Sequence, residues 1–208
     1  MEIAIIVACI IAVLAVASSR KAIESWLHKQ FGKETVGGRQ FAYRDLHGIS
    51  LSEFEWLLRQ SIAENNSTAT AWAFEVLLHE RGPQVAWPLL FRILDATGED
   101  AAAGVLDTVL PSRSVDEDDP NHPDRWLSII GADSTWAYLV GKTYLNRGKT
   151  LVGVDKEKLK WNKSNALKFL RAAQERALDA SAIAVVVPLY EAALYLHYKE
   201  GKAAERNE

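Results

Sequence analysis

The feature that most constrains this chain is an uncharged apolar run near its N-terminus. Residues Ile3 to Ser19 read IAIIVACIIAVLAVASS and contain no charge, proline or glycine. A helix of this length spans about 25 Å, at the short end of what crosses the hydrocarbon core of a bilayer. A helix on a water-soluble surface normally carries a polar face, and this run has none before Ser18. We therefore expect a single transmembrane helix that is retained as a signal anchor.

Two other interpretations of this segment stay open. Ala15 to Ala17 offers small residues for cleavage of a secretory signal, although the acidic start Met1-Glu2 is unlike the basic start of such signals. Cys9 follows Ile6-Val7-Ala8 as in a lipoprotein signal, but few residues precede it and the apolar run continues after it. Whether residues 1–17 are cleaved is therefore not decided by the sequence.

The charges beside the apolar run predict its orientation. Glu2 precedes the run, and Glu24 is the only acidic residue between positions 20 and 33. The basic residues of that segment are Arg20, Lys21, Lys29 and Lys33. Because positive flanks stay in the cytoplasm, we expect a single-pass membrane protein with a cytoplasmic domain. The alternative is a periplasmic or otherwise exported domain.

The helix is expected to continue past the membrane as an amphipathic segment to Phe31. Ala22, Ile23, Trp26, Leu27 and Phe31 recur at helical spacing. Aromatic and basic side chains are typical of the membrane interface, which favours contact with the lipid headgroups here. Arg20, Lys21 and Trp26 are the candidate membrane-interface residues. Docking of the stripe onto the protein's own domain is the alternative.

The rest of the chain suits one domain of ordinary size. The sequence has 208 residues, a net charge of −3 and 49% hydrophobic residues. A nucleic-acid partner is not expected, because such proteins usually carry a basic face. Cys9 is the one cysteine, so no intramolecular disulfide forms. Most of the seven tryptophans are expected in the core.

Helical periodicity dominates this domain and predicts an all-α fold. Residues 1–31 are interpreted as the anchor with its amphipathic continuation, 32–51 as a glycine-rich linker, and 52–208 as the helical domain. Ser52 and Glu55 have capping-box spacing at the start of the first helix. Helices are expected at 53–63, 70–80, 83–96, 100–110, 123–130, 135–147, 164–178 and 180–199. Such short helices pack as hairpins in a bundle or a solenoid.

One segment of about a quarter of the chain, from Trp136 to Ala182, resembles a repeat family. Its first helix carries Ala137, Val140-Gly141, Tyr144 and Gly148, and its second carries Asn165-Ala166, Phe169, Ala172-Ala173 and then Ala180 or Ala182. This pattern resembles the Sel1-like branch of the tetratricopeptide repeats. The resemblance implies a concave surface that binds a protein or peptide and performs no chemistry. The connection between the two helices, from Gly148 to Ser164, is longer than in the family.

The residue types of this segment also have a physical reading of their own. Gly141 and the alanines are small enough to let two helices approach closely. Tyr144 and Phe169 are expected to fill the space between them.

No familiar catalytic or metal-binding motif is present. The histidines are not spaced like the ligands of HExxH sites, and the sequence has no CxxC, GxSxG, Walker loop or GxGxxG. No cofactor is therefore expected. The densest polar cluster lies in the acidic loop, Pro111 to Pro123, and at the residue after it. It comprises Asp116, Glu117, Asp118, Asp119, His122 and Asp124. Three interpretations of this cluster stay open: a solvated loop, a loop that docks a partner, and a divalent-cation site.

These observations predict a non-enzymatic, membrane-anchored scaffold or adaptor that binds a protein partner, such as an accessory subunit of a membrane complex. The candidate partner-binding residues are Trp161, which lies in a basic connection between helices, and the acidic residues from Asp116 to Asp119. The alternatives are a membrane-associated, metal-dependent hydrolase that uses residues 116–124, and an exported Sel1-like binding protein.

Overall fold

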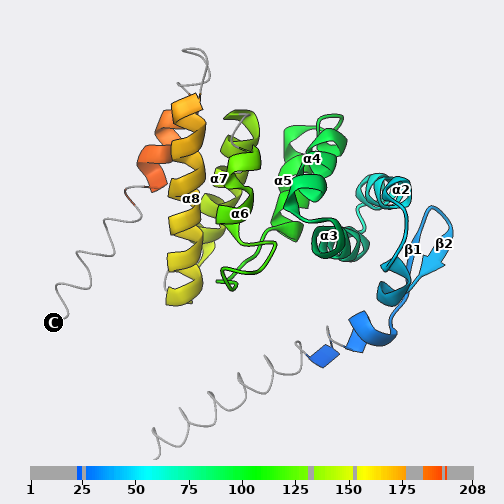
Figure 1. Cartoon of the computed structure of the whole chain (residues 1–208). Coiled ribbons are helices and arrows are strands. Elements are labelled where there is room, and N and C mark those ends of the chain that lie inside the picture. Colours follow the sequence, from blue (N-terminus) through cyan, green and yellow to red (C-terminus); the bar gives the residue numbers. More distant parts are fainter. Residues whose placement is uncertain are drawn as a thin grey trace, which may run out of the picture.

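The structure is a computed structural model that describes residues 23–24, 27–130, 134–151, 154–176, 185–193 and 195. A short hairpin and a 3-10 helix precede a series of α-helices. The elements are β1 (Glu34–Val36), β2 (Arg39–Phe41), η1 (Tyr43–Leu46), α2 (Leu51–Ala63), α3 (Ser67–Arg81), α4 (Pro83–Leu94), α5 (Glu99–Val109), α6 (Pro123–Ile130), α7 (Ser134–Thr150) and α8 (Lys156–Arg176). Residues 185–193 add a further helical segment beside α8 (Figure 1).

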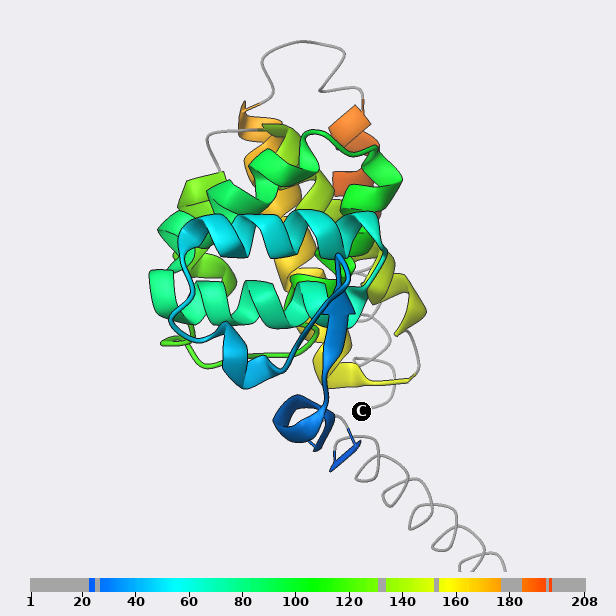
Figure 2. The same ribbon diagram turned by 90° about the vertical axis from the view of Figure 1, so that its right-hand side faces the viewer.

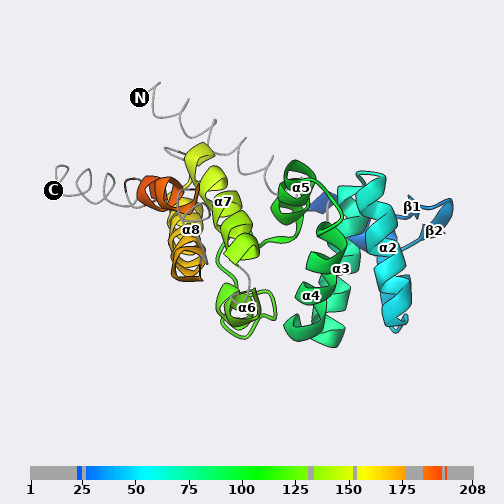
Figure 3. The ribbon, with the colours of Figure 1, turned by 90° about the horizontal axis from the view of Figure 1, so that it is seen from above.

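The helices alternate between two rows. In one row α2 contacts α4 and α4 contacts α6, and in the other α3 contacts α5 and α5 contacts α7. The rows are joined where α3 packs on α2 and α4, and where α7 packs on α6 and α8. Figure 3 shows the resulting progression from the hairpin at one end to α8 at the other. Successive helices therefore stack along the described part of the chain, each packing on helices of both rows.

A column of aromatic side chains connects the helices through the core. Trp87 of α4 lies 4.8 Å from Phe74 of α3 and 4.3 Å from Trp126 of α6, measured between ring centroids. Trp126 then stacks on Phe169 of α8 at 4.9 Å, and Phe169 on Tyr144 of α7 at 6.0 Å. Such ring contacts contribute beyond the area they bury. The expectation that most tryptophans belong to the core is confirmed for the described residues, where Trp72, Trp87, Trp126 and Trp136 are buried.

The close approach expected between the helices around Gly141 is confirmed. A Cβ placed on Gly141 of α7 would stand 2.7 Å from Cγ of Leu170 in α8, so only glycine fits without a shift. Tyr144 and Phe169 fill the adjacent space, and both are completely buried. The contact follows from the packing of these residues and does not by itself identify a repeat family.

The connection between α7 and α8 is shorter than predicted. Gly148, expected to end the first helix, lies inside α7, which continues to Thr150. Asp155 then caps α8, because its carboxylate accepts a hydrogen bond from the backbone N–H of Lys158 at 3.0 Å. The basic stretch interpreted as a loop therefore forms the first turns of α8, which begins eight positions before Ser164.

The capping box of α2 lies two residues before the predicted pair. Ser50 is the N-cap, and it exchanges hydrogen bonds with Glu53: the Ser50 N–H donates to the Glu53 carboxylate at 2.9 Å, and the Glu53 N–H donates to Ser50 Oγ at 3.3 Å. Glu55, the predicted partner of Ser52, instead pairs with Arg59 and Arg92. Both serines have the required spacing to a glutamate, so the sequence pattern is ambiguous.

The segment from 32 to 51, predicted as a linker, is folded against the helices. Gly37 and Gly38 form the hairpin turn at φ +56° and +74°, which glycine adopts without steric cost. Val36, Phe41 and Leu46 are buried in the hydrophobic core. Figure 2 shows the hairpin crossing α2 and α3. The prediction missed these strands because each has only three residues, too few for a visible alternation.

The described residues are mostly helical, as the predicted all-α class requires. None of the helices within the described ranges is long and apolar enough to cross a membrane. The predicted transmembrane helix, Ile3 to Ser19, lies outside those ranges. The anchor therefore stays a prediction from the sequence.

Candidate protein-binding site

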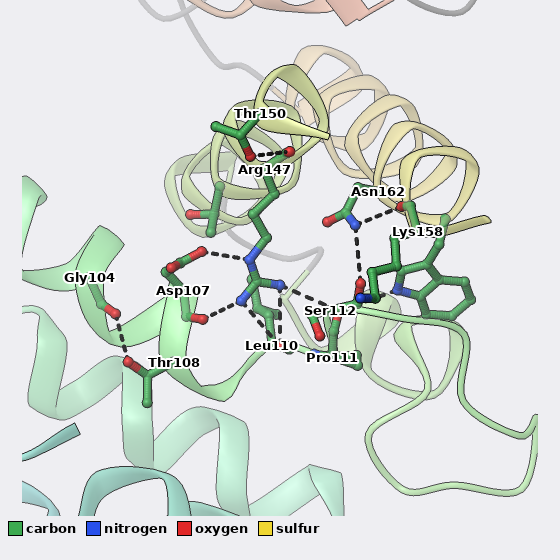
Figure 4. A network of polar contacts seen from close by, with 12 residues as sticks. Gly104, Asp107, Thr108, Leu110, Pro111, Ser112, Arg147, Thr150, Lys158 and Asn162 are labelled. Carbon is green, nitrogen blue, oxygen red and sulfur yellow. Dashed lines mark hydrogen bonds and ion pairs between the residues drawn. The ribbon is translucent and has the colours of Figure 1, made fainter. Parts of the chain in front are cut away.

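The acidic loop follows α5 and is fixed at its start by side chains of α7 and α8. The indole N–H of Trp161 donates to the carbonyl oxygen of Pro111 at 3.3 Å, and the amide of Asn162 donates to that of Ser112 at 3.2 Å. Figure 4 shows Asn162 and Arg147 reaching the loop from the two helices. Because carbonyl groups at the end of α5 have no helical partner, these donors satisfy them and hold the chain in place.

Arg147 is the central clamp of this network. Its Nε donates to Oδ1 of Asp107 at 2.5 Å, and its Nη1 donates to the carbonyl oxygens of Leu110 and Pro111 at 3.3 and 3.4 Å. Its Nη2 also donates to the carbonyl oxygen of Asp107. The side chain of Arg147 is only 13% exposed. A planar guanidinium suits this role because it presents several donors in fixed directions.

The middle of the acidic loop is tied to α6. The N–H of Asp119 donates to the carbonyl oxygen of Asp116 at 2.9 Å and closes a turn. Arg125 of α6 donates from Nε to the carbonyl oxygen of Glu117 at 2.9 Å and from Nη2 to Oδ1 of Asp118 at 3.3 Å. The loop therefore has a defined path through its most acidic part.

The four predicted acidic residues divide into two roles. Asp116, Glu117 and Asp118, which we call the acidic tip, are exposed. Asp119 is half-buried, and its carboxylate accepts the N–H of Asn121 at 2.7 Å. The acidic tip thus presents carboxylates to solvent, whereas Asp119 stabilises the turn behind them.

Trp161 lies next to the acidic loop, as its predicted role in partner binding requires. It packs against the loop and supports it. Its ring packs edge-on against His122 at 5.7 Å, and it is half-buried. The structure therefore places Trp161 against both ends of the acidic loop, at Pro111 and at His122, which are distant from it in the sequence. Trp161 acts as a positioning residue for the loop.

A cleft opens between the acidic loop, α3 and the end of α5. Its volume is about 190 Å³. Phe74, Leu78 and Val115 give it apolar walls, and Glu75 and Asp119 line it with carboxylates. A long cationic side chain matches such a lining, because its stem is apolar and its head is charged.

Within the described residues, the acidic loop does not form a metal site. No group of three or more His, Cys, Asp or Glu side chains is placed there to hold a metal ion. Asp124 pairs with Lys168 of α8, and His122 accepts from the N–H of Asp124 at 3.3 Å. These two residues therefore have structural contacts of their own.

The three candidate membrane-interface residues, Arg20, Lys21 and Trp26, lie outside the described residues. Their assignment remains a prediction from the sequence. The sequence does not reveal that Arg147 and Arg125 hold the acidic loop. The only local signals are that Arg147 lies near the end of a helix and that Arg125 follows an acidic run.

No family model, curated protein or solved structure matches this chain.

Proposed function

We propose that this protein is a non-enzymatic, membrane-anchored helical scaffold that binds a basic segment of a membrane-associated protein partner through its acidic loop. The observation that carries the proposal is a contrast within the loop. Its backbone is fixed by Arg147, Trp161 and Arg125, while the carboxylates of the acidic tip point to solvent. An ordered array of like charges favours a partner of opposite charge, since little entropy is lost when the partner docks.

The cleft beside the loop supplies the second half of the surface. A lysine or arginine of the partner enters between the apolar walls and pairs with the carboxylate of Asp119, because the carboxylate of Glu75 is already paired with Lys29. The acidic tip then pairs with further basic residues of the same segment. Rim charges of this kind mainly steer association and make it sensitive to salt.

The two-row arrangement of helices supports a binding role as well. A Sel1-like or solenoid-type domain presents long surfaces for protein contact, and the pair α7–α8 has the close approach that such repeats need. The domain assignment that we propose is an anchor with its continuation over 1–31 and a binding domain that follows. The hairpin segment 32–51 belongs with that domain because its apolar residues are part of the core.

Copurification of the full chain from native membranes in mild detergent tests the proposal. The loop variant is Asp116→Asn, Glu117→Gln and Asp118→Asn, and it should lose the bound partner. A matched variant removes the same charge elsewhere: Asp95→Asn, Asp100→Asn and Glu191→Gln, all exposed in the structure. It should retain the partner, and added salt should release the partner from the unmodified protein.

Two outcomes would contradict the proposal. One is a chain that runs alone as a monomer under gentle conditions. The other is equal loss of the partner in both variants, which would indicate a general effect of charge. A divalent-ion effect on thermal stability that disappears in the loop variant would instead favour the metal-dependent hydrolase.

The cytoplasmic location is proposed from the flanking charges and has its own test. N-terminal sequencing of the native protein should find Met1 or Glu2 at the start of the chain, as for a retained anchor. A chain that starts at Ser18 would mean a cleaved signal and an exported domain.

A further inference from the structure

The helical residues just after the predicted anchor have two different faces. Residues 23–24 and 27–31 are helical, and we call them the exit helix. One face carries His28 and Lys29, which contact the folded domain. The other face carries Leu27 and Phe31, which are four residues apart and therefore lie on one side of the helix. Ile23, four positions before Leu27 in the sequence, is exposed as well.

The polar face is clamped to the domain through Lys29. Its Nζ lies 2.6 Å from Oε1 of Glu75 in α3 and 4.3 Å above the ring of Tyr43 in η1. Burial lowers the pKa of Lys29, but the hydrogen bond and the charge of Glu75 outweigh it and raise the pKa overall. Lys29 therefore stays charged and joins the exit helix to both α3 and η1.

His28 provides a second point of attachment. Its Nε2 lies 2.8 Å from Oε1 of Glu34 at the start of β1, and its ring lies 5.2 Å from that of Trp72. The N–H of Gly32 donates to the carbonyl oxygen of His28 at 2.6 Å, which is a helical hydrogen bond at the point where the chain turns into β1. A Cβ on Gly32 would stand 2.4 Å from that oxygen, so the close turn into β1 requires glycine.

The opposite face leaves a stripe of large apolar side chains uncovered. Ile23 is 56% exposed, Leu27 is 42% exposed and Phe31 is 77% exposed. These three residues, the apolar stripe, do not dock onto the protein's own domain. A contiguous apolar row on the surface marks an interaction with another molecule or a membrane.

We propose that the apolar stripe lies in the interface of the lipid bilayer, and that the exit helix is a rigid bracket that fixes the orientation of the domain at the membrane. This inference rests on the membrane anchoring proposed above. Continuity of the chain argues for lipid as the occupant, because only Arg20, Lys21 and Ala22 separate the apolar run from Ile23. The stripe therefore begins four positions after Ser19, the end of the predicted membrane segment.

Charge near the stripe suits the same surface. Arg20 and Lys21 precede Ile23 by three and two positions in the sequence. Amphipathic helices of this kind insert their apolar face at the level of the headgroups, with basic residues near anionic lipids. Because Lys29 and His28 tie the helix to the domain, the acidic loop is held at a set position relative to the bilayer.

Spin labels on the full chain test the position of the stripe. In a Cys9→Ser background, the variants Leu27→Cys and Phe31→Cys are labelled and reconstituted in vesicles of phosphatidylcholine and phosphatidylglycerol. The matched control is Asp95→Cys, an exposed residue at the end of α4, far along the chain from the stripe. We expect labels at 27 and 31 to be accessible to oxygen and shielded from a water-soluble nickel probe, and the label at 95 to show the reverse.

Every other outcome overturns the inference. The outcomes differ in whether the membrane anchoring of the proposed function fails as well. If the chain remains in the vesicles but all three labels contact the water-soluble probe, the stripe is not in lipid and the anchor is unaffected. If labels at 27 and 31 are shielded from both probes, protein covers the stripe. If the chain does not associate with the vesicles, the membrane anchoring itself fails.

A second measurement tests the bracket. Labels at Phe31→Cys and Asp95→Cys report the distance between the exit helix and the domain. Lys29→Gln should broaden that distance distribution, because it removes the charge that contacts Glu75. Lys33→Gln makes the same change of charge four residues later and should leave the distribution narrow. Equal distributions in both variants would show that Lys29 does not fix the helix.

Discussion

Gly141 of α7 lies against Leu170 of α8 so closely that a side chain at position 141 has no room. A Cβ there would stand 2.7 Å from Leu170 Cγ and 3.0 Å from the backbone nitrogen of Leu170. Leu170 is completely buried, so its side chain cannot simply turn away. This contact sets the distance between α7 and α8, the two helices that hold the start of the acidic loop.

Gly141→Ala should therefore destabilise the protein. Forcing a methyl group into a packed core costs about 1–3 kcal/mol. Alanine recovers about 1 kcal/mol through its higher helix propensity. We expect a net loss of up to about 2 kcal/mol in the free energy of unfolding, measured by urea denaturation.

Gly104→Ala is the matched control for this change. Gly104 is exposed within α5, and a Cβ there would meet nothing within 4 Å. The same substitution should stabilise this position by about 0.5–1 kcal/mol. A gain of stability at both positions would show that α7 and α8 are not in close contact at Gly141.

The sequence predicted those parts of the fold that local signals determine. Arg81-Gly82-Pro83 ends α3 and starts α4 as expected, and α6 runs from Pro123 to Ile130 as expected. The start of α8 was missed although Asp155 is a good cap, because the lysines after it were interpreted as a loop. The hairpin was missed although Gly37-Gly38 is a turn signal, because its strands are too short to show periodicity.

The candidate binding site was predictable only in its composition. The acidic residues and Trp161 stand out in the sequence, but their relation depends on contacts between distant positions. The hydrogen bond from Trp161 to Pro111 joins residues 50 positions apart in the sequence, and that from Arg147 to Leu110 joins residues 37 positions apart. No local pattern reveals such pairs, since they arise only when α7 and α8 pack beside the end of α5.

Arg147→Lys should loosen the acidic loop. Lysine keeps the charge but loses the fork that reaches Asp107, Leu110 and Pro111 together. Hydrogen bonds to charged groups contribute about 1.5–3 kcal/mol, so we expect a loss of this order in stability. Backbone amides between Pro111 and Pro123 should also exchange faster with deuterium.

Arg113→Lys serves as the control for this prediction. Arg113 is exposed in the same loop and makes no hydrogen bond or ion pair in the described part of the chain. Its replacement should leave both stability and exchange unchanged. Unaltered exchange of the loop in Arg147→Lys would refute the role of Arg147 as a clamp.

Tyr144→Phe should leave the protein as stable as before or more stable. The Tyr144 hydroxyl is buried and has no hydrogen-bond partner among the described residues. Burial also raises its pKa far above the usual value, so the group stays neutral. A buried hydroxyl without a partner costs about 1–3 kcal/mol, and phenylalanine removes it while keeping the ring against Phe169. A loss above about 1 kcal/mol on thermal unfolding would instead indicate a partner that the hydroxyl needs.

Because Asp155 caps α8 with its carboxylate, part of the free energy of unfolding should depend on pH in the acid range. The hydrogen bond from the Lys158 backbone N–H lowers the pKa of Asp155 below its ordinary value of 3.8. The unfolded chain therefore binds this proton more readily than the folded chain. The contribution of Asp155 to the free energy of unfolding is present at pH values above its ordinary pKa. It is lost as the pH falls through the lower pKa that Asp155 has in the folded chain.

Asp155→Asn separates this titration from the cap itself. Asparagine caps helices about as well as aspartate but does not ionise in this range. Stability near neutral pH should change little, whereas its decline below about pH 4 should become less steep than in the unmodified protein. Urea midpoints measured across the acid range provide the comparison, and Asp95→Asn controls for the loss of one exposed carboxylate. An identical acid decline in Asp155→Asn and the unmodified chain would mean that Asp155 does not cap α8 as a carboxylate.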